Sequence, residues 1–328
     1  MLAVGPNGAG KTNLLEALHV GTQGFSPRTR SDAQLIRFGE KAARVGLRGR
    51  HAETELEVGV VLRAGAGKRA RMNGAAVRSV EQLRAELATL VFTPDRLAVV
   101  KGGPAARRAY VDRSLGRLLP ARARLPEEYA AAVGQRNAAL RRVETRASPS
   151  SSLEPWTASV AALGGQLADA RTTALGLLEP EAAAAARELG LSELRLEYRG
   201  EPITESALVE RLPRDLERGS TGLGPHLDDV GVLSGSRDLR LYGSQGEQRL
   251  AVLALLLGEA AVIRERRGAA PLLLLDDVLS ELDPGRRRAL AGLLEGRGQA
   301  LVTATDASFL PVEPDLLLHV SPGEVRPD

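Results

Sequence analysis

A chain of 328 residues that is 43% hydrophobic and 26% charged is long enough for one large domain or two, and its composition excludes a disordered or collagen-like protein. It has no cysteine, which excludes disulfides and cysteine nucleophiles. It also has no apolar run near the roughly 20 residues of a membrane helix and no charged N-terminal region typical of a signal peptide, so we expect a cytoplasmic protein. The net charge of +3 divides into +13 over residues 1–150 and −10 over residues 151–328, as in proteins that meet a polyanion with one face, although such charges can also mix in the folded state.

The first residues predict a strand, a glycine-rich loop and a helix. Leu2, Ala3 and Val4 are apolar, and residues 11–20 carry leucines at helical spacing. Residues 54–62 alternate between apolar and polar side chains, which predicts a strand with one buried face.

From about residue 96 the pattern becomes helical. We expect helices over 127–146, 156–178 and 180–189, the last opened by Pro180 at its first turn. Strand alternation resumes over 194–199. These patterns predict a head formed by residues 1–95 and 200–328, with a helical lobe over residues 96–199 inserted into it.

The glycine-rich loop matches the phosphate-binding pattern G-x-x-x-x-G-K-[ST]. It comprises Gly5, Pro6, Asn7, Gly8, Ala9, Gly10, Lys11 and Thr12. In such a loop backbone N–H groups cradle phosphates, the lysine reaches the β- and γ-phosphates of ATP, and the hydroxyl of Thr12 binds Mg²⁺. A simple glycine-rich turn is the alternative, and the flanking strand and helix argue against it.

A second motif is an apolar strand, residues 271–275, that ends at Asp276 and Asp277. Paired with the loop it predicts a Walker B element, in which Asp276 holds Mg²⁺ and Asp277 is the general base for the attacking water. A purely structural role is the alternative. Asp277 is also shorter than the glutamate common at this position in related ATPases.

Three further segments follow the order of ABC-type ATPases. A signature-like segment, made up of Ser244, Gln245, Gly246 and Glu247, precedes a helix over 250–259, although these residues could simply cap that helix. Asp283 lies in a D-loop-like segment, and either Thr303 or Thr305 occupies the place of a switch residue. Because the signature of one subunit completes the phosphate-loop site of another in this class, we expect an ATP-dependent homodimer with two-fold symmetry.

Residues 91–112, 129–140 and 224–229, taken together with the ATPase motifs, resemble the RecF family of recombination mediators over nearly the whole chain. The resemblance implies an α/β fold, namely an ABC-type ATPase head of the P-loop NTPase class, related to SMC heads, with an inserted and mainly helical second lobe. It implies a slow switch-type ATPase that hydrolyses ATP to ADP and phosphate, uses Mg²⁺ and is stimulated by DNA.

The resemblance also implies DNA, RecR and RecO as partners, with RecA loading in gap repair, replication restart and the SOS response, and no membrane partner. The family carries strands before the phosphate loop, whereas here the loop begins at residue 5; we expect a misassigned start codon. Position 227 is Leu where the family tends to carry a basic residue, and Gln34 is only a candidate for the Q-loop glutamine.

Residues 96–150 carry 12 basic and 4 acidic side chains, which predicts a contact with DNA phosphates. The expected contact residues are Lys101, Arg107, Arg108 and Arg113. Aromatic residues make up only 3% of the chain, which favours duplex over single-stranded DNA. A solvated helix face is the alternative, and Arg107 and Arg108 could instead pack within the protein.

Two other functions share parts of this pattern. The nucleotide-binding subunit of another ABC-type assembly, such as a transporter, is disfavoured by the long stretch with a basic helical lobe between Thr12 and Tyr242. A nucleotide-dependent DNA scaffold that does not hydrolyse ATP shares every motif. It differs only in whether Asp277 supports turnover.

Overall fold

The structure, a computed structural model, describes residues 1–29, 31–51, 54–65, 67–78 and 80–328. Packing divides the chain into two compact units. The first comprises Met1–Arg96, Glu188–Gly190 and Ala260–Asp328, and the second comprises Leu97–Arg187 and Leu191–Glu259. Each unit is described by itself.

The first unit contains a six-stranded sheet in the order β13-β12-β1-β11-β10-β6, parallel except for the β12–β13 pair. Its strands are β1 (Leu2–Val4), β6 (Thr89–Phe92), β10 (Leu272–Leu275), β11 (Ala300–Ala304), β12 (Leu317–Ser321) and β13 (Glu324–Pro327). Strand β1 pairs with β11 and β12, and β10 pairs with β11. Because parallel strands end at one edge of a sheet, the loops after β1, β10 and β11 meet at that edge.

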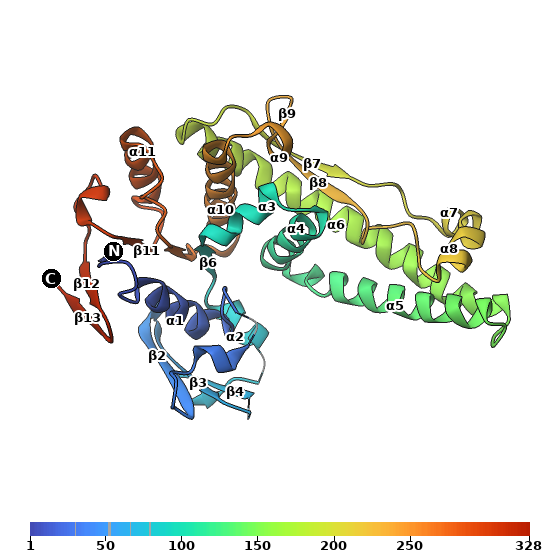
Figure 1. The fold of residues 1–328 in the computed structure, drawn as a ribbon, viewed down its shortest axis with the longest axis horizontal. Helices are drawn as coiled ribbons and strands as arrows, with labels where there is room; N and C mark the ends of the chain where they lie inside the picture. The colour runs from blue at the N-terminus through green and yellow to red at the C-terminus, as the bar shows by residue number, and fades with distance from the viewer. Residues whose placement is uncertain (30, 52–53, 66, 79) are drawn as a thin grey trace. The chain divides into compact units, whose positions relative to one another are not determined.

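A second sheet of the first unit is antiparallel and has the order β2-β3-β4-β5 (Figure 1). Its strands are β2 (Ala42–His51), β3 (Thr54–Arg63), β4 (Gly67–Met72) and β5 (Ala75–Ala76). Alternate residues Val58, Val60 and Leu62 are buried with Val20 of helix α1 (Lys11–Gln23), so the predicted strand over 54–62 is confirmed as β3. Gly21 brings α1 close to β2, because a Cβ there would lie 2.4 Å from a terminal methyl group of Leu47 and would displace that side chain.

Short helices complete the first unit. They are η1 (Asp32–Leu35), α2 (Val80–Glu86), α11 (Pro284–Leu294) and η5 (Ala307–Phe309), with η2 (Pro94–Leu97) at the boundary between the units. The apolar core of the parallel sheet includes Ala3, Leu15, Val91, Leu274 and Leu301, all buried. This core fixes β1, and therefore the loop that follows it, against the centre of the sheet.

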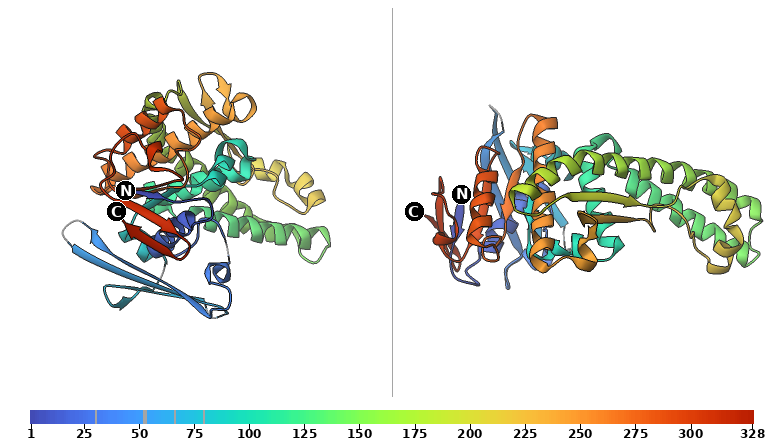
Figure 2. Two further views of the ribbon diagram at one scale, coloured as in Figure 1. Left: turned by 60° about the vertical axis from the view of Figure 1, so that its left-hand side comes forward. Right: turned by 90° about the horizontal axis from the view of Figure 1, so that it is seen from above.

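The second unit is mainly helical. Its helices are α3 (Ala98–Lys101), α4 (Pro104–Leu118), η3 (Pro120–Arg122), α5 (Leu125–Glu144), η4 (Ser150–Leu153), α6 (Glu154–Glu188), α7 (Glu205–Glu210), α8 (Leu212–Arg218), α9 (Leu239–Tyr242) and the first part of α10 (Gln245–Arg267). A small antiparallel sheet joins β7 (Leu194–Arg199), β8 (Asp229–Ser234) and β9 (Arg237–Asp238). Figures 1 and 2 show α5 and α6 running side by side, with α7 and α8 near one end. Leu115, Tyr129, Val160 and Leu167 are buried together between α4, α5 and α6.

The predicted separate helix over 180–189 is wrong, because α6 continues through Pro180. A proline inside a helix loses one backbone hydrogen bond and meets the carbonyl four residues earlier. Buried side chains on both sides of the proline, Leu178 before it and Ala182 after it, offset that cost. Helix α10 also packs very closely here, since a Cβ on Gly258 would lie 2.5 Å from the backbone nitrogen of Ala182.

Residues 200–259, predicted to belong to the head, pack with the helical unit. All six residues of β7 pair with β8, so a boundary at residue 199 would divide a sheet. The functional assignment of the domains stays a prediction. Within the described residues, none of the helices combines the length and the apolar character that a membrane span requires.

The interior of the second unit holds a charged cluster around Arg136, which is fully buried. Its guanidinium donates at 2.7 Å to the carboxylate of Asp215 and at 2.8 Å to the hydroxyl of Thr221. Asn137 accepts hydrogen bonds from both the backbone nitrogen and the hydroxyl of Thr221. The cluster therefore ties α5 to α8 and to the segment that leads into β8.

Replacing Arg136 by leucine should lower the free energy of unfolding by about 3–5 kcal/mol, because Asp215 would be left as a buried charge without a partner. The control is Arg124→Leu, which removes an exposed ion pair with Glu128 and should cost less than about 1 kcal/mol. Urea denaturation measures both. Equal losses in the two variants would contradict the role of the Arg136 cluster.

Candidate nucleotide-binding site

The phosphate-binding loop leaves β1 after Val4 and enters α1 at Lys11. Gly8 and Gly10 have φ angles of 81° and 108°, which side chains rarely adopt. A Cβ at either position would meet no atom within 4 Å, so backbone conformation, not crowding, requires glycine there. The loop is closed by a hydrogen bond of 3.2 Å from the nitrogen of Ala9 to the carbonyl of Pro6.

Gly5 is required for a different reason. A Cβ on Gly5 would lie 2.3 Å from the backbone oxygen of Val320 in β12. Real Cβ atoms do not approach a carbonyl so closely, so any other residue would push the loop away from the neighbouring strand. The first glycine of the motif is therefore fixed by packing against β12.

Lys11 lies inside the loop with 8% of its surface exposed. Its ammonium group donates to the carbonyl of Gly5 at 2.6 Å and to that of Pro6 at 3.0 Å. The ammonium group of Lys11 is therefore held over the loop. The backbone N–H groups of the loop can donate hydrogen bonds to phosphate oxygens at the same place.

Four residues predicted from separate motifs meet at the edge of the parallel sheet. The hydroxyl of Thr12 lies 3.0 Å from one carboxylate oxygen of Asp276 and 3.2 Å from the other. The hydroxyl of Thr303 donates to Asp276 at 2.8 Å and accepts the backbone N–H of Asp277 at 2.9 Å. The start of α1 and strand β11 are thus joined through one buried carboxylate at the end of β10.

Asp277 has an unusual backbone. Its φ angle is 49°, a left-handed conformation that costs a non-glycine residue roughly 1–3 kcal/mol. Its carboxylate is exposed and, within the described residues, makes no hydrogen bond, whereas Asp276 beside it is buried. The strain directs the two adjacent carboxylates to different environments, one buried and bonded and the other open.

The donor set fits Mg²⁺. A hydroxyl and a carboxylate are the hard oxygen ligands that this ion prefers, and Thr12 and Asp276 place them side by side. Among the described residues there is no group of three or more His, Cys, Asp or Glu side chains that could hold a metal on its own. That agrees with Mg²⁺ bound through one or two protein oxygens together with the phosphates of a nucleotide.

The structure separates the two predicted switch threonines. Thr303 is fully buried and bonded to the Walker B aspartates, whereas Thr305 is exposed after the end of β11. Thr305 lines an open hollow of about 770 Å³ beside the phosphate loop, together with Gly5, His319 and Arg326. No sequence pattern marks His319 or Arg326, because they come from β12 and β13 at the far end of the chain.

The signature-like residues lie in the second unit and form a complete capping box. The hydroxyl of Ser244 accepts the backbone N–H of Glu247 at 3.2 Å, and the carboxylate of Glu247 accepts that of Ser244 at 2.8 Å. This hydrogen bond from the backbone of Ser244 and an ion pair with Arg237 hold the pKa of Glu247 below its usual value. Ser244, Gln245 and Gly246 are exposed at the start of α10, so the cap leaves the helix N-terminus open to solvent.

Asp283 also has a local role as the N-cap of α11. Its carboxylate accepts the backbone N–H of Arg286 at 3.0 Å, and this bond lowers the pKa of Asp283. Gln34, the Q-loop candidate, is exposed and accepts a hydrogen bond from the hydroxyl of Thr29. Neither contact reveals a function in catalysis.

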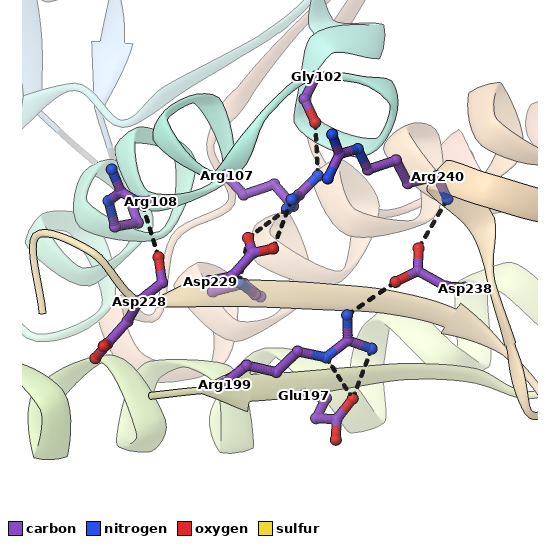
Figure 3. Close-up of polar contacts among 10 residues, drawn as sticks. Gly102, Arg107, Arg108, Glu197, Arg199, Asp228, Asp229, Asp238 and Arg240 are labelled. Carbon is purple, nitrogen blue, oxygen red and sulfur yellow. Dashed lines mark hydrogen bonds and ion pairs between the residues drawn. The ribbon is translucent and has the colours of Figure 1, made fainter. Parts of the chain in front are cut away.

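The structure divides the predicted DNA-contact residues (Figure 3). Arg107 is 4% exposed and forms a two-fold ion pair with Asp229, each bond 2.7 Å, while its third nitrogen donates to the carbonyl of Gly102. Arg108 donates to the carbonyl of Asp228 at 2.7 Å. We therefore remove Arg107 from the predicted DNA-contact residues, because its guanidinium is buried and each of its three nitrogens donates a hydrogen bond within the protein. Lys101 and Arg113 are exposed.

The ion pair with Arg107 also lowers the pKa of its partner, Asp229. Burial alone would raise the pKa of Asp229, but hydrogen bonds from Arg107 and from the backbone of Val230 hold the pKa below its ordinary value. Asp229 is thus a stable negative partner at neutral pH. Arg107 and Arg108, which form a basic cluster in the sequence, therefore connect α4 to Asp229 of β8 and to the residue before it.

The fold and this site define an ABC-type ATPase head: a parallel sheet with a phosphate loop, a Walker B strand, and a separate signature-like helix. A family profile described as the RecF/RecN/SMC N-terminal domain matches residues 1–322. The chain belongs to the RecF family.

Individual relatives agree with this assignment. DNA replication and repair protein RecF of Myxococcus xanthus is 37% identical, over 99% of this chain and 90% of that protein. The protein of the same name from Moorella thermoacetica is 38% identical, over 94% of this chain and 84% of that protein. The predicted family and fold class are therefore confirmed.

Solved structures give the same result. The recombination mediator protein RecF-ATP of the RecFOR pathway matches all of this chain and 91% of that chain, with a TM-score of 0.88 and 28% identity. An SMC head bound to the winged-helix domain of ScpA matches with a TM-score of 0.57 and 16% identity, which is a likeness of fold alone.

Replacing Gly5 by alanine should lower the free energy of unfolding by about 1–3 kcal/mol, because the added methyl group overlaps the carbonyl of Val320. The matched control is Gly46→Ala in β2, where a Cβ would meet no atom within 4 Å. Urea denaturation compares the two. A Gly5→Ala variant as stable as the wild type would disprove the close contact with β12.

Proposed function

We propose that this protein is an ATP-switched, DNA-binding dimer that acts as a recombination mediator in the repair of gapped DNA. The observation that supports this most strongly is the meeting of Thr12, Asp276 and Thr303 beside the loop that holds Lys11. These residues come from three separate motifs, and together they form the arrangement that phosphoryl-transfer enzymes require.

ATP would bind with its phosphates on the loop of residues 5–12. The backbone N–H groups of the loop and of the N-terminus of α1 would donate hydrogen bonds to the phosphate oxygens. Lys11 would exchange its bonds to the carbonyls of Gly5 and Pro6 for bonds to the β- and γ-phosphates. Thr12 and Asp276 would hold Mg²⁺, which supplies positive charge to the phosphates. The binding of ATP by RecF in a solved structure supports this proposal.

Asp277 would orient and deprotonate the attacking water. Its carboxylate is exposed and free of hydrogen bonds within the described residues, whereas Asp276 is already bonded to two hydroxyls. The strained backbone and the bond from its N–H to Thr303 hold Asp277 in place. An aspartate here is one methylene shorter than glutamate and reaches the water less directly, which agrees with a slow ATPase that works as a switch. Stimulation of this ATPase by DNA is part of the proposal and follows from the family alone.

The signature residues would act in trans. Ser244 opens a helix whose N-terminus is exposed, and such a terminus carries partial positive charge that favours phosphate. The γ-phosphate on one subunit would thus be met by Ser244, Gln245 and Gly246 of a second copy, with Asp283 of the D-loop nearby. Two ATP molecules would then close a homodimer, and hydrolysis would open it.

The partners follow from the family. We infer that the closed dimer binds DNA, that it acts with RecR and RecO, and that it promotes RecA loading in gap repair, replication restart and the SOS response. The relatives named as DNA replication and repair proteins, and the solved RecF structure of the RecFOR pathway, support this inference. Lys101 and Arg113 are the remaining candidates for DNA contact in the second unit. Arg108 is a further candidate, although it is half-buried and one of its nitrogens donates to the carbonyl of Asp228.

The variants Asp277→Asn and Lys11→Ala should fail at different steps. Asp277→Asn should bind ATP with nearly wild-type affinity and release phosphate at least about 100-fold more slowly, because the base is lost while Asp276 remains. Lys11→Ala should bind ATP weakly, because the cation over the loop is lost. Calorimetric ATP binding and a phosphate-release assay, each with and without duplex DNA, separate the two.

The result also tests the alternative of a scaffold without hydrolysis. Wild-type protein that binds ATP but releases no phosphate, even with DNA, would exclude the ATPase function. Loss of ATP binding in Asp277→Asn would show that Asp277 is a metal ligand or has a structural role.

A mixing experiment tests the action of Ser244 in trans. Ser244→Arg and Lys11→Ala should each be nearly inactive alone. In a mixed dimer one site combines an intact phosphate loop with an intact signature, so part of the ATPase activity should return on mixing. Phosphate release against the ratio of the two proteins measures this effect.

Because Ser244 also caps α10, a second variant separates the two roles. Aspartate is an equally good N-cap, so Ser244→Asp should keep the helix while its negative charge repels the γ-phosphate. It should match the wild type in thermal stability and lack ATPase activity. Normal activity in Ser244→Asp, or no recovery on mixing, would leave the motif as a helix cap only.

A further inference from the structure

The antiparallel sheet β2–β3–β4 has one face without a function so far. Its inner face carries Val58, Val60 and Leu62, buried near α1. The intervening residues of the same strands point to the other side and are exposed or half-buried. Figures 1 and 2 show the sheet in blue with α1 along its inner side.

The outer face has two different halves. In one half Arg48 pairs with Glu57 at 3.2 Å, and Arg50 lies opposite Glu55 in the register. In the other half every charged residue is an arginine. We call this half the arginine face; it consists of Arg44, Gly46, Gly59, Val61, Arg63, Arg69 and Arg71.

The four arginines of this face are free of partners in the described part of the chain. Arg44, Arg63, Arg69 and Arg71 are exposed and form no ion pair or hydrogen bond with the side chains described. In the second unit, by contrast, Arg107 is buried in an ion pair. Four like charges side by side repel one another, and an anion bound among them removes that repulsion.

The cross-strand register places these arginines close together. Arg44 and Arg69 flank Val61 on either side, and Arg71 lies opposite Gly59. Neighbouring strands are about 4.8 Å apart and residues on one face of a strand about 6.8 Å apart, so the four Cα atoms span roughly 10 by 14 Å. That area matches a short run of phosphates rather than a single small anion.

The backbone below the arginines is open to a ligand. A Cβ on Gly46 or on Gly59 would meet no atom of the described residues within 4 Å, so these residues leave the centre of the face low and open. Gly59, Val61 and Gly67 line a hollow of about 200 Å³ together with Arg63, Arg69 and Arg71. Guanidinium groups around a shallow floor can bind phosphate oxygens in pairs.

We propose that the arginine face binds the phosphate backbone of duplex DNA. Arginine binds phosphodiester oxygens through its fork of N–H donors, and counterion release makes such contacts favourable for a polyanion. Residues 42–72 contain no Phe, Tyr or Trp, so this face offers no platform for unstacked bases, which favours a duplex over a single strand. The site rests on the proposed function, because it takes DNA as the partner and assigns its contact to the first unit.

The test compares two double variants of the full chain in the presence of ATP. Arg69→Gln with Arg71→Gln removes two charges from the arginine face. The control, Arg48→Gln with Arg124→Gln, removes two exposed charges that are already paired with Glu57 and Glu128. Fluorescence anisotropy of a labelled blunt duplex over a series of salt concentrations gives the affinity and its salt dependence for each protein.

We expect the arginine-face variant to bind at least about tenfold more weakly at low salt, for unrelated sequences alike. Its slope of log K against log salt should be shallower by about 1.8, since each lost phosphate contact changes the slope by about 0.9. The control should keep the wild-type slope within about 0.5, and thermal unfolding should be unchanged in both.

The outcomes separate the site from the proposed function. Wild-type protein that binds no duplex with ATP, with ADP or without nucleotide would overturn the proposed function. Wild-type binding with equal slopes in all three proteins would overturn the arginine face alone. The arginine-face variant could instead lose calorimetric binding to tripolyphosphate while it binds the duplex as the wild type does. That result would assign the face to free polyphosphate and likewise overturn the proposal.

Discussion

The carboxylate of Asp276 is the group on which the geometry of the candidate nucleotide site depends. It is buried at the end of β10 and receives hydroxyls from Thr12 at the start of α1 and from Thr303 in β11. The start of α1, the end of β10 and strand β11 are therefore held together by one charged group. Loss of the carboxylate would free Thr303, and with it the backbone of Asp277.

Buried charge performs a structural task in the second unit as well. Arg136, Arg107 and Arg171 each form an ion pair with an aspartate, namely Asp215, Asp229 and Asp112. The basic charges of residues 96–150 are thus partly matched by acidic residues within the same unit, from α4 to β8. In the first unit the four arginines of the arginine face, Arg44, Arg63, Arg69 and Arg71, have no such partners among the described residues.

The sequence predicted the elements that have strong local signals. The phosphate loop, α1, β3, β7 and the Walker B strand follow from glycine positions, strand alternation and an apolar run. It could not predict that α6 continues through Pro180, because tertiary packing against α10 offsets the cost of the proline. The need for glycine at position 5 also depends on a residue that lies more than 300 positions away, Val320.

The remaining differences have one physical origin. A cluster of arginines in a sequence gives no information about which of them will find a carboxylate in the fold. Arg107 pairs with Asp229 of β8, whereas Arg69 and Arg71 pair with no acidic side chain in the part of the chain that the structure describes. Ser244 shows a related ambiguity, since it caps α10 and also lies at the exposed helix N-terminus to which we assign the γ-phosphate contact only as a proposal.

If ATP closes two copies of this chain into a dimer, the molar mass in solution should change with the nucleotide. Light scattering after size-exclusion chromatography would be measured for Asp277→Asn with ATP, with ADP and without nucleotide. We expect twice the monomer mass with ATP only. The same mass in all three conditions would contradict the ATP-closed dimer.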